Sequence, residues 1–365
     1  MSKHGRVLVA MSGGVDSSVA AIMLHEEGYE VVGITMKTWD YASSGGSTKE
    51  TGCCSLDSIN DARALAVNFG FPHFILDIRN EFGDAVIDNF VDEYIAGRTP
   101  NPCVLCNTHI KWEALMKRAD VLDCEFIATG HYAKVRQHDN GRYVVSKGFD
   151  ESKDQSYVLW GVSQENLART RFPLGGFSKK EIREMAYQMG QKELASKSES
   201  YEICFVPNND YRSFLRHRRP ELDTEIGPGN FILSDGTVIG QHIGYPYFTI
   251  GQRKGLGIAL GKPMYVIEIM PESNTVVLGE EHELERSQTE VGSVNLMKYA
   301  SLPSDGFEAV TKIRYKDPGA LSKLQLENGN MLVNFEHAVK GIAPGQSAVF
   351  YEGDDVVGGG FIRKV

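Results

Sequence analysis

Ser12-Gly13-Gly14-Val15-Asp16-Ser17-Ser18, close to the start of the chain, is the stretch that decides the fold. It follows an apolar run over residues 7–11, which predicts a short buried strand, and it leads into a helical pattern that ends near residue 27. A strand that turns through serine and glycine into a helix leaves the first backbone N–H groups of that helix without partners, beside the positive end of its dipole. The stretch therefore predicts an anion cradle, which the glycines allow an oxygen cluster to approach closely.

This cradle is not a Walker loop, because it lacks the Gly-Lys-Ser/Thr ending. It resembles the pyrophosphate loop of enzymes that cleave ATP between the α and β phosphates, giving AMP and pyrophosphate. Asp16 could then hold a magnesium ion carried on the phosphates. The alternative is a plain turn between a strand and a helix, but all seven residues match the loop and the order of strand, loop and helix is the required one.

The composition is that of an ordinary soluble globular protein, with 42% apolar and 24% charged residues. A length of 365 residues exceeds what a single core usually supports, so we expect two or three domains. No stretch approaches the roughly 20 continuous apolar residues of a membrane span, and the N-terminus lacks a secretory apolar region, so we expect a cytoplasmic protein without a membrane partner. The net charge of −10 argues against indiscriminate nucleic-acid binding but allows a local basic surface.

Residues 7–132 alternate short apolar strands with amphipathic helices, the pattern of an α/β doubly wound parallel sheet. We expect strands over residues 7–11, 31–36, 73–78 and 125–128. In such sheets the ligand lies beyond the carboxyl ends of the strands, so Met36 and Gly130 should share the crevice with the cradle. Strand-end structure without a binding role is the alternative for both residues.

The sequence predicts three domains. The first domain, residues 1–207, should continue through a hairpin at Asp139-Asn140-Gly141 and a helix over 179–189 that Ser178 and Glu181 cap. A small β-rich central domain should cover residues 208–277, and the short strands and turns of residues 278–365 predict a C-terminal β-barrel. The densest positive run lies in a helical pattern over 210–219 and suits either RNA phosphates or a solvated helix face; its arginines are Arg212, Arg216, Arg218 and Arg219.

The six cysteines do not form a secreted disulfide pattern. We expect a helix to begin near residue 108 with Asn107 as its cap, which would place Cys106 beside its N-terminus and lower the pKa of that thiol. Cys204 is the second candidate thiol. Two alternatives are a zinc site and a structural role, the latter best suited to Cys124 ahead of an apolar strand, whereas paired redox-active thiols are favoured. The zinc site would take its four thiolates from Cys53, Cys54, Cys103 and Cys106.

An ATP-cleaving loop and two reactive thiols on one chain indicate that sulfur displaces an activated oxygen. With these features the sequence resembles the tRNA-specific 2-thiouridylase family, whose members place sulfur on position 2 of the wobble uridine of certain tRNAs. The resemblance covers nearly the whole chain. It lies in seven motifs that occur in one order, at residues 12–18, 97–107, 128–132, 153–157, 200–205, 249–257 and 312–315.

The resemblance implies a set of functional residues. Cys106 and Cys204 would be catalytic. ATP would bind at Ala10, Met11, Ser12, Gly13, Gly14, Val15, Asp16, Ser17, Met36 and Gly130. The target base would meet Asn101, Pro102 and Cys103. The tRNA would meet His131, Lys153, Asp154, Gln155, Arg314, Tyr315 and Gln346. No protein-bound metal site is implied beyond the magnesium of the nucleotide.

The resemblance also implies a mechanism and partners. ATP would adenylate O2 of the uridine, and a persulfide on Cys204, received from a sulfur-carrier protein or cysteine desulfurase, would deliver sulfur to C2. Cys106 would release hydrogen sulfide from the persulfide or resolve it as a Cys106–Cys204 disulfide. Many family members carry aspartate at the position of Cys103, which leaves the acid/base open among Asp16, Asp154 and water. Two rivals remain, an amide-forming ligase with the same loop, such as argininosuccinate synthase, and a non-catalytic tRNA-binding or sulfur-relay protein.

Overall fold

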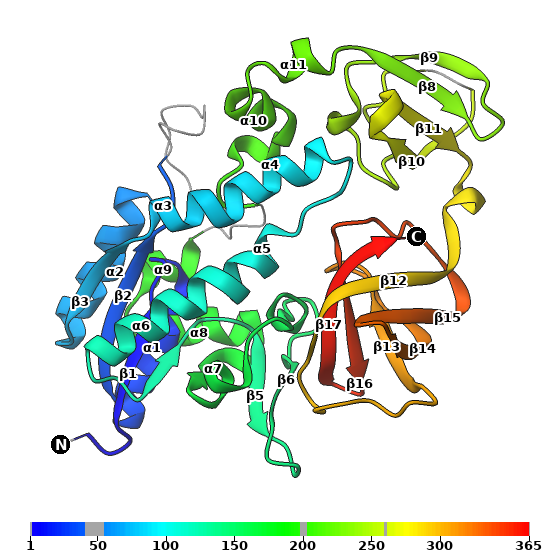
Figure 1. The fold of residues 1–365 in the computed structure, drawn as a ribbon. Helices are drawn as coiled ribbons and strands as arrows, with labels where there is room; N and C mark the ends of the chain where they lie inside the picture. The colour runs from blue at the N-terminus through cyan, green and yellow to red at the C-terminus, as the bar shows by residue number, and fades with distance from the viewer. Residues whose placement is uncertain (1, 41–54, 198–202, 259–260, 365) are drawn as a thin grey trace. The chain divides into compact units, whose positions relative to one another are not determined.

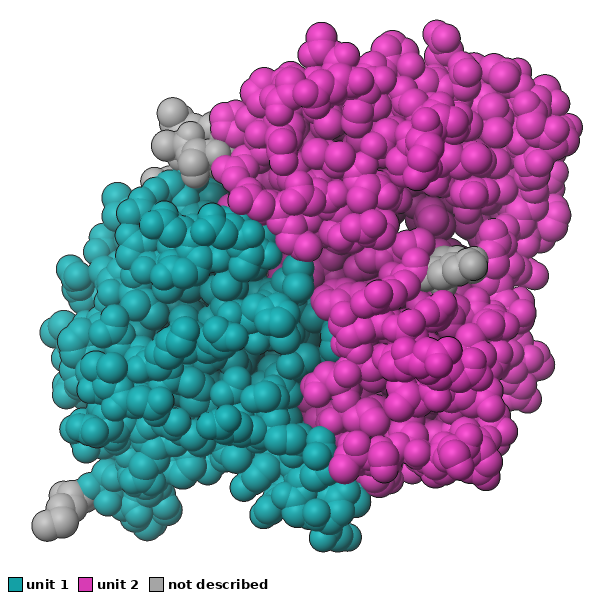
Figure 2. Space-filling model, viewed as in Figure 1, with its two compact units in different colours: residues 1–86, 103–209, 354–356 teal, residues 87–102, 210–353, 357–365 magenta. Residues whose placement is uncertain are grey.

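The computed structural model describes residues 2–40, 55–197, 203–258 and 261–364 (Figure 1). The chain forms two compact units (Figure 2). Unit 1 consists of Met1–Val86, Cys103–Asn209 and Asp354–Val356. Unit 2 consists of Ile87–Pro102, Asp210–Gly353 and Val357–Val365.

A five-stranded sheet in the order β3-β2-β1-β4-β7 forms the centre of unit 1, and all of its pairs are parallel. Its strands are β1 (Arg6–Ala10), β2 (Glu30–Lys37), β3 (His73–Asp77), β4 (Phe126–Ala128) and β7 (Thr170–Arg171). The predicted parallel sheet is confirmed, and β7, only two residues long, is an edge that no apolar pattern could reveal.

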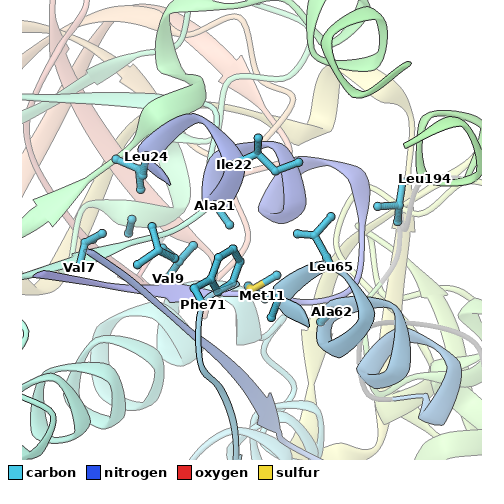
Figure 3. Close-up of a cluster of buried hydrophobic side chains, with 13 residues drawn as sticks. Val7, Val9, Met11, Ala21, Ile22, Leu24, Ala62, Leu65, Phe71 and Leu194 are labelled. Atoms are coloured by element: carbon cyan, nitrogen blue, oxygen red, sulfur yellow. The ribbon is translucent and has the colours of Figure 1, made fainter. Parts of the chain in front are cut away.

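Helices α1 (Val15–Glu27) and α2 (Leu56–Phe69) pack on one face of this sheet (Figure 3). Val7 and Val9 of β1 alternate with Leu8, so they point to this face while Leu8 points to the other. They meet Ile22 of α1 and Leu65 of α2, and each such buried side chain contributes about 1.5–3 kcal/mol through the hydrophobic effect. Helix α6 (Trp112–Val121) also contacts β1 and β4. This packing fixes the position of the loop between β1 and α1.

The local sequence signals place the other elements of unit 1. Ser55 caps α2 by accepting the Ser58 N–H, and Ser178 and Glu181 form the expected capping box of α8 (Lys179–Gln188). The predicted hairpin joins β5 (Ala133–Gln137) to β6 (Tyr143–Lys147). Further α-helices of this unit are α3 (Arg79–Phe82), α7 (Gln164–Ala168) and α9 (Lys192–Ser196).

One helix begins earlier than the sequence predicted. Helix α5 (Pro102–Leu105) continues through a π-helical segment (Cys106–Lys111) into α6, so the helix starts at Pro102 and not near residue 108. Proline suits the first helical position because its missing N–H has no intrahelical partner there and its φ is already helical. The prediction that Cys106 precedes a helix N-terminus is therefore wrong.

Unit 2 contains a small four-stranded sheet with the order β10-β11-β8-β9. Its strands are β8 (Gly229–Leu233), β9 (Val238–His242), β10 (Tyr265–Met270) and β11 (Thr275–Gly279). Gly236 adopts a φ of +86° in the turn between β8 and β9, a conformation that glycine adopts without strain. Unit 2 also contains the α-helices α4 (Asp88–Ile95), α10 (Tyr211–Arg218) and α11 (Leu222–Glu225).

The C-terminal strands close into a six-stranded antiparallel barrel, which confirms the predicted barrel. Its order is β12-β15-β14-β13-β16-β17, and pairing of β12 with β17 completes the circle. The strands are β12 (Glu285–Leu296), β13 (Phe307–Lys312), β14 (Ala320–Glu327), β15 (Asn330–Lys340), β16 (Ser347–Glu352) and β17 (Asp355–Lys364). Closure leaves no exposed barrel edge. In the described part of the chain, we find no helix with the length and apolar character needed to cross a membrane.

Candidate nucleotide and thiol site

The loop between β1 and α1 has the geometry of an anion cradle. Gly14 occupies the N-cap of α1 in an extended conformation, and no side chain caps the helix there. The Ser12 N–H donates to Ser17 Oγ at 3.0 Å, and the two serine hydroxyls lie 3.2 Å apart. These bonds fold the loop back on the first turn of α1, whose N–H groups and dipole favour an anion.

Two glycines allow the backbone to pack closely around this loop. Gly13 has a φ of +69°, and a Cβ there would lie 2.0 Å from the carbonyl oxygen of Ser58 in α2. A Cβ on Gly130 would lie 2.8 Å from the Ser17 nitrogen, so Gly130 packs directly on the first turn of α1. The structure thus brings Gly130 and the loop together, as expected from the parallel order of β1 and β4.

The end of β2 is tied to the same region. Thr35 is buried, and its Oγ1 donates to the Met11 carbonyl at 2.8 Å. Met36 follows as a half-buried residue at the carboxyl end of β2. Ala10 and Met36 therefore end neighbouring parallel strands, where a nucleotide is expected to lie.

Asp16 lies in a compact polar cluster that sequence reasoning missed. Lys179 Nζ donates to both carboxylate oxygens of Asp16 at 2.7 Å, and the Tyr132 hydroxyl donates to Oδ1 at 2.7 Å. The Tyr132 N–H in turn donates to Gln155 Oε1 at 3.0 Å. Lys179 is 163 positions from Asp16, so no local pattern could have indicated the pair.

A second lysine contacts the loop itself. Lys197 Nζ donates to the Gly13 carbonyl at 2.9 Å and to Asp61 Oδ2 at 2.6 Å. Asp61 belongs to α2, so Lys197 joins the loop to that helix. The loop is consequently held from α2, α8 and the segment after α9.

The candidate thiols share unit 1 with the loop but differ in their surroundings. Cys204 is exposed, and its neighbour Phe205 is buried against Phe82 with ring centroids 5.8 Å apart. Cys106 is half-buried at the start of the π-helical segment. The expected N-cap, Asn107, is instead buried within that segment and donates to the Val158 carbonyl at 3.0 Å. Helix-terminal activation of Cys106 therefore has no structural support.

The remaining cysteines divide into an exposed one and a core one. Cys103 has an exposed side chain, yet the protein atoms crowded around its thiol raise its pKa by desolvation, with a smaller contribution from Cys106. Cys103 is therefore a neutral thiol at pH 7 and a poor replacement for an ionised carboxylate. Burial raises the pKa of Cys124 to about 11, which agrees with the structural role expected for it. Cys53 and Cys54 lie outside the described residues, as does any zinc site built on them.

The expected tRNA-contacting residues of unit 1 also have structural partners. Asp154 Oδ1 accepts the N–H groups of Gly148 and Ser156 at 3.0 and 3.1 Å, so this carboxylate shapes its own loop. The ring of His131 packs 5.7 Å from that of Trp112, and burial lowers its pKa well below the ordinary value. His131 is consequently neutral at pH 7. Lys153 is half-buried in the loop before Asp154.

The expected target-base and tRNA residues of unit 2 lie along two segments that meet. Gln346 Nε2 donates to the Pro100 carbonyl at 2.7 Å, and Asn101 Nδ2 lies 3.4 Å from Ser347 Oγ. Gln346 therefore holds the turn that leads into Asn101 and Pro102. Arg314 and Tyr315 are exposed after β13.

The arginines of α10 are engaged within unit 2. Arg218 pairs with Asp88 of α4 at 2.8 Å, and Arg219 with Asp92 at 3.3 Å. Arg216 pairs with Asp223 at 2.8 Å and lies over the ring of Tyr247. These partly exposed side chains form surface ion pairs that join α10 and the residue after it to α4 and α11. Sequence reasoning missed the pairing because the acidic partners of Arg218 and Arg219 lie about 130 residues earlier.

Comparisons with known proteins cover the full chain. Three family models match it in succession: the tRNA methyl transferase HUP domain at residues 5–208, the tRNA methyl transferase PRC-barrel domain at 212–280 and the aminomethyltransferase beta-barrel domain at 288–362. The tRNA-specific 2-thiouridylase MnmA of Amoebophilus asiaticus is 64% identical over 361 residues, which cover 99% of this chain and 96% of that protein. Its namesake in Cytophaga hutchinsonii is 62% identical over 364 residues, covering 100% and 99%. That of Salinibacter ruber is 57% identical over 368 residues, covering 100% and 96%.

Proposed function

The chain belongs to the tRNA-specific 2-thiouridylase family, a family of tRNA-uridine 2-sulfurtransferases, and on this premise we propose that it thiolates the wobble uridine of tRNA by an ATP-dependent route. The observation that carries the proposal is the identity of more than half of all residues with curated relatives along the entire chain. The geometry of the anion cradle supports it independently, because thiolation of a carbonyl carbon first requires a better leaving group than oxygen.

In the first step, ATP binds with its phosphates on the loop between Ala10 and Ser17 and its adenosine against Met36 and Gly130. O2 of the uridine attacks the α phosphorus, a C2–O–AMP bond forms, and pyrophosphate leaves. The uncapped first turn of α1 supports this step, since its N–H groups can donate hydrogen bonds to the phosphate oxygens. Asn101, Pro102 and Cys103 would receive the base once it has left the anticodon stack.

In the second step, a terminal persulfide sulfur on Cys204 attacks C2 and AMP departs with the former O2. Cys106 then attacks the Cys204 sulfur, so that the sulfur–sulfur bond of the persulfide breaks, C2 keeps the sulfur as a thiocarbonyl and a Cys106–Cys204 disulfide remains. In the alternative route, Cys106 first releases hydrogen sulfide, which attacks C2. Either route oxidises two thiols to a disulfide, and an external dithiol must reduce it. The exposure of Cys204 supports its loading by a sulfur-carrier protein.

Asp16 and Asp154 are poor candidates for the acid/base of the reaction. Both Asp16 and Asp154 already accept several hydrogen bonds from protein groups, and Cys103 is a neutral thiol. The proton on N3 of the uridine is therefore left to water or to a phosphate oxygen.

Magnesium stays a prediction, as does the cytoplasmic location. Magnesium usually reaches such sites on the phosphates and adds one or two carboxylates. In the described ranges no group of three or more histidine, cysteine or acidic residues offers a metal site, and the Asp16 carboxylate accepts three hydrogen bonds. This donor set does not suit a metal ion, so no step of the mechanism depends on one held by the protein.

The experiment combines purified protein, ATP, unmodified tRNA and a persulfide donor, and it measures 2-thiouridine by mass spectrometry together with AMP and pyrophosphate. Cys204→Ser should lose thiolation and Cys106→Ser should lose turnover, whereas the buried Cys124→Ser serves as the matched control. Retained thiolation in both Cys106→Ser and Cys204→Ser would refute the mechanism. ATP consumption that needs neither cysteine nor tRNA would favour an amide-forming ligase.

A further inference from the structure

Lys179 is a nearly buried lysine beside the anion cradle, for which the resemblance implies no role. Its residue surface is 8% exposed, and its Nζ lies 2.7 Å from both carboxylate oxygens of Asp16. Asp16 is the second residue of α1 and so belongs to the first turn of that helix. The ammonium group therefore binds the side chain of a residue in the first turn of α1, the turn whose N–H groups form the cradle.

The position of Lys179 is fixed by its helix. The capping box of Ser178 and Glu181 sets the start of α8, and the Lys179 N–H donates to Asp150 Oδ2 at 3.0 Å. One turn further, Ile182 packs in a buried cluster with Val15 of α1. Helices α1 and α8 are thus bound by a polar contact and an apolar one, which leaves the ammonium little freedom to move away from the loop.

The Lys179 and Asp16 side chains keep some exposure to solvent. Lys179 is 11% exposed and Asp16 is 33% exposed, so a small anion can reach the pair. Lys179 also lines a pocket of about 630 Å³ on α8 and α9, together with Lys180, Arg183 and Glu184. The residues that line this pocket do not include the loop between β1 and α1, so the pocket is separate from the cradle.

The bonding of Asp16 indicates what this carboxylate does. Its oxygens accept two hydrogen bonds from Lys179 and one from Tyr132, all at 2.7 Å. A carboxylate bound in this way orients an ammonium group and is poorly available to a metal ion. A lysine held at the place where phosphate charge develops needs no reorganisation during the reaction, which is the condition for electrostatic catalysis.

We propose that Lys179 binds the β and γ phosphates of ATP and stabilises the pyrophosphate leaving group, and that Asp16 and Tyr132 position it for this role. The inference rests on the proposed function, since it concerns the ATP cleavage that precedes thiolation. The bond between the α phosphorus and the bridging oxygen breaks, the electron pair stays on that oxygen, and the Lys179 ammonium offsets the charge that accumulates there. Inorganic pyrophosphate is the probe that isolates this contact, because AMP lacks both phosphates.

The test measures the binding of pyrophosphate and, separately, of AMP to the full chain by titration calorimetry in buffer with EDTA, so that no metal contributes. Lys179→Met should weaken pyrophosphate binding at least 10-fold and leave AMP binding within twofold of wild type. Lys179→Arg, which keeps the charge, should recover most of the loss. Lys180→Met is the matched control, because Lys180 is an exposed lysine on the same helix and in the same pocket. It should leave both affinities within twofold.

A second measurement needs no variant and stands if Lys179→Met fails to fold. In trace acetylation of the wild-type protein, followed by peptide mass spectrometry, pyrophosphate should slow modification of Lys179 at least fivefold, AMP should not, and Lys180 should be unaffected. Three results would overturn this inference without affecting the proposed function. They are unchanged pyrophosphate binding in Lys179→Met, equal loss of AMP and pyrophosphate binding in that variant, and acetylation of Lys179 that pyrophosphate does not slow. A wild-type protein that binds neither AMP nor pyrophosphate would overturn the proposed ATP site as well.

Discussion

Gly13→Ala should disrupt the loop between β1 and α1 more than any other glycine-to-alanine substitution in or beside this loop. Gly13 has a φ of +69°, in the left-handed region that alanine rarely adopts. The new Cβ would also lie 2.0 Å from the Ser58 carbonyl oxygen and 2.6 Å from the Ser58 carbonyl carbon. Both of these atoms belong to the backbone of α2, so a side-chain rotation cannot relieve the overlap.

The two penalties can be estimated separately. A left-handed conformation costs an alanine about 1–2 kcal/mol. Forcing an extra carbon into a packed site costs about 1–3 kcal/mol. Their sum of about 2–5 kcal/mol corresponds to a fall in Tm of about 5–15 °C for a unit of this size. If the loop instead moves to relieve the overlap, stability recovers but the cradle loses its geometry and ATP binding falls.

Three control variants separate these effects. Gly14→Ala lies next to Gly13 but has a φ of −92°, and its Cβ would meet only Ser12 Oγ at 3.5 Å, so it should lower Tm by only about 1–3 °C, because alanine is a poorer N-cap than glycine. Gly141→Ala has a φ of +82° with nothing within 4 Å, so it should show the conformational penalty alone. Gly130→Ala has an ordinary φ but a Cβ 2.8 Å from the Ser17 nitrogen, so it should show the overlap alone.

The assay is thermal unfolding followed by circular dichroism, with ATP binding measured on each folded variant. We expect Gly13→Ala to show the largest combined loss of Tm and ATP affinity, Gly130→Ala and Gly141→Ala to lose less Tm, and Gly14→Ala to melt close to wild type. If Gly13→Ala and Gly14→Ala have the same Tm and the same ATP affinity, the reasoning from φ and packing is refuted.

Three further predictions concern other parts of the chain. Acidification from pH 7.5 to 5.0 should lower the Tm. Burial, with a smaller contribution from the nearby Lys111 charge, holds the pKa of His131 well below its ordinary value of 6.5. The unfolded state therefore takes up a proton that the folded state does not. The decrease begins as the pH falls through 6.5 and should be smaller in His131→Gln; an identical decrease in both proteins would exclude this cause. Iodoacetamide at pH 7.5 should label exposed Cys204 at least 100-fold faster than Cys124, whose pKa burial raises to about 11, and equal rates by peptide mass spectrometry would contradict the burial of Cys124. Arg218→Glu should lower the Tm by about 1–3 °C, because the new carboxylate would face the carboxylate of Asp88. The further change Asp88→Arg should restore the Tm, and a Tm that does not recover would argue against this pair.

The sequence predicted those features that neighbouring residues determine. The strand, loop and helix around Gly13, the capping box of Ser178 and Glu181 and the hairpin at Asp139-Asn140-Gly141 each depend on a few consecutive residues, and each is confirmed. Turn and cap chemistry is local, so a single sequence carries it.

Features that depend on distant residues could not be predicted in this way. The Lys179 contact with Asp16 forms only because α8 packs on α1, and the pairing of Arg218 with Asp88 forms only because α10 packs on α4. The helix start at Pro102 differs in kind, because its cause is local: proline suits the first helical position, and Asn107 lies inside the helix although asparagine is a common cap.

The most direct test of the central claim follows the oxygen that sulfur replaces. A tRNA whose wobble uridine carries ¹⁸O at O2 is incubated with the protein, ATP and a persulfide donor, and the AMP is analysed by mass spectrometry. If ATP adenylates O2, each 2-thiouridine formed should be accompanied by one AMP that contains ¹⁸O. Recovery of the label in water, with unlabelled AMP, would contradict the account.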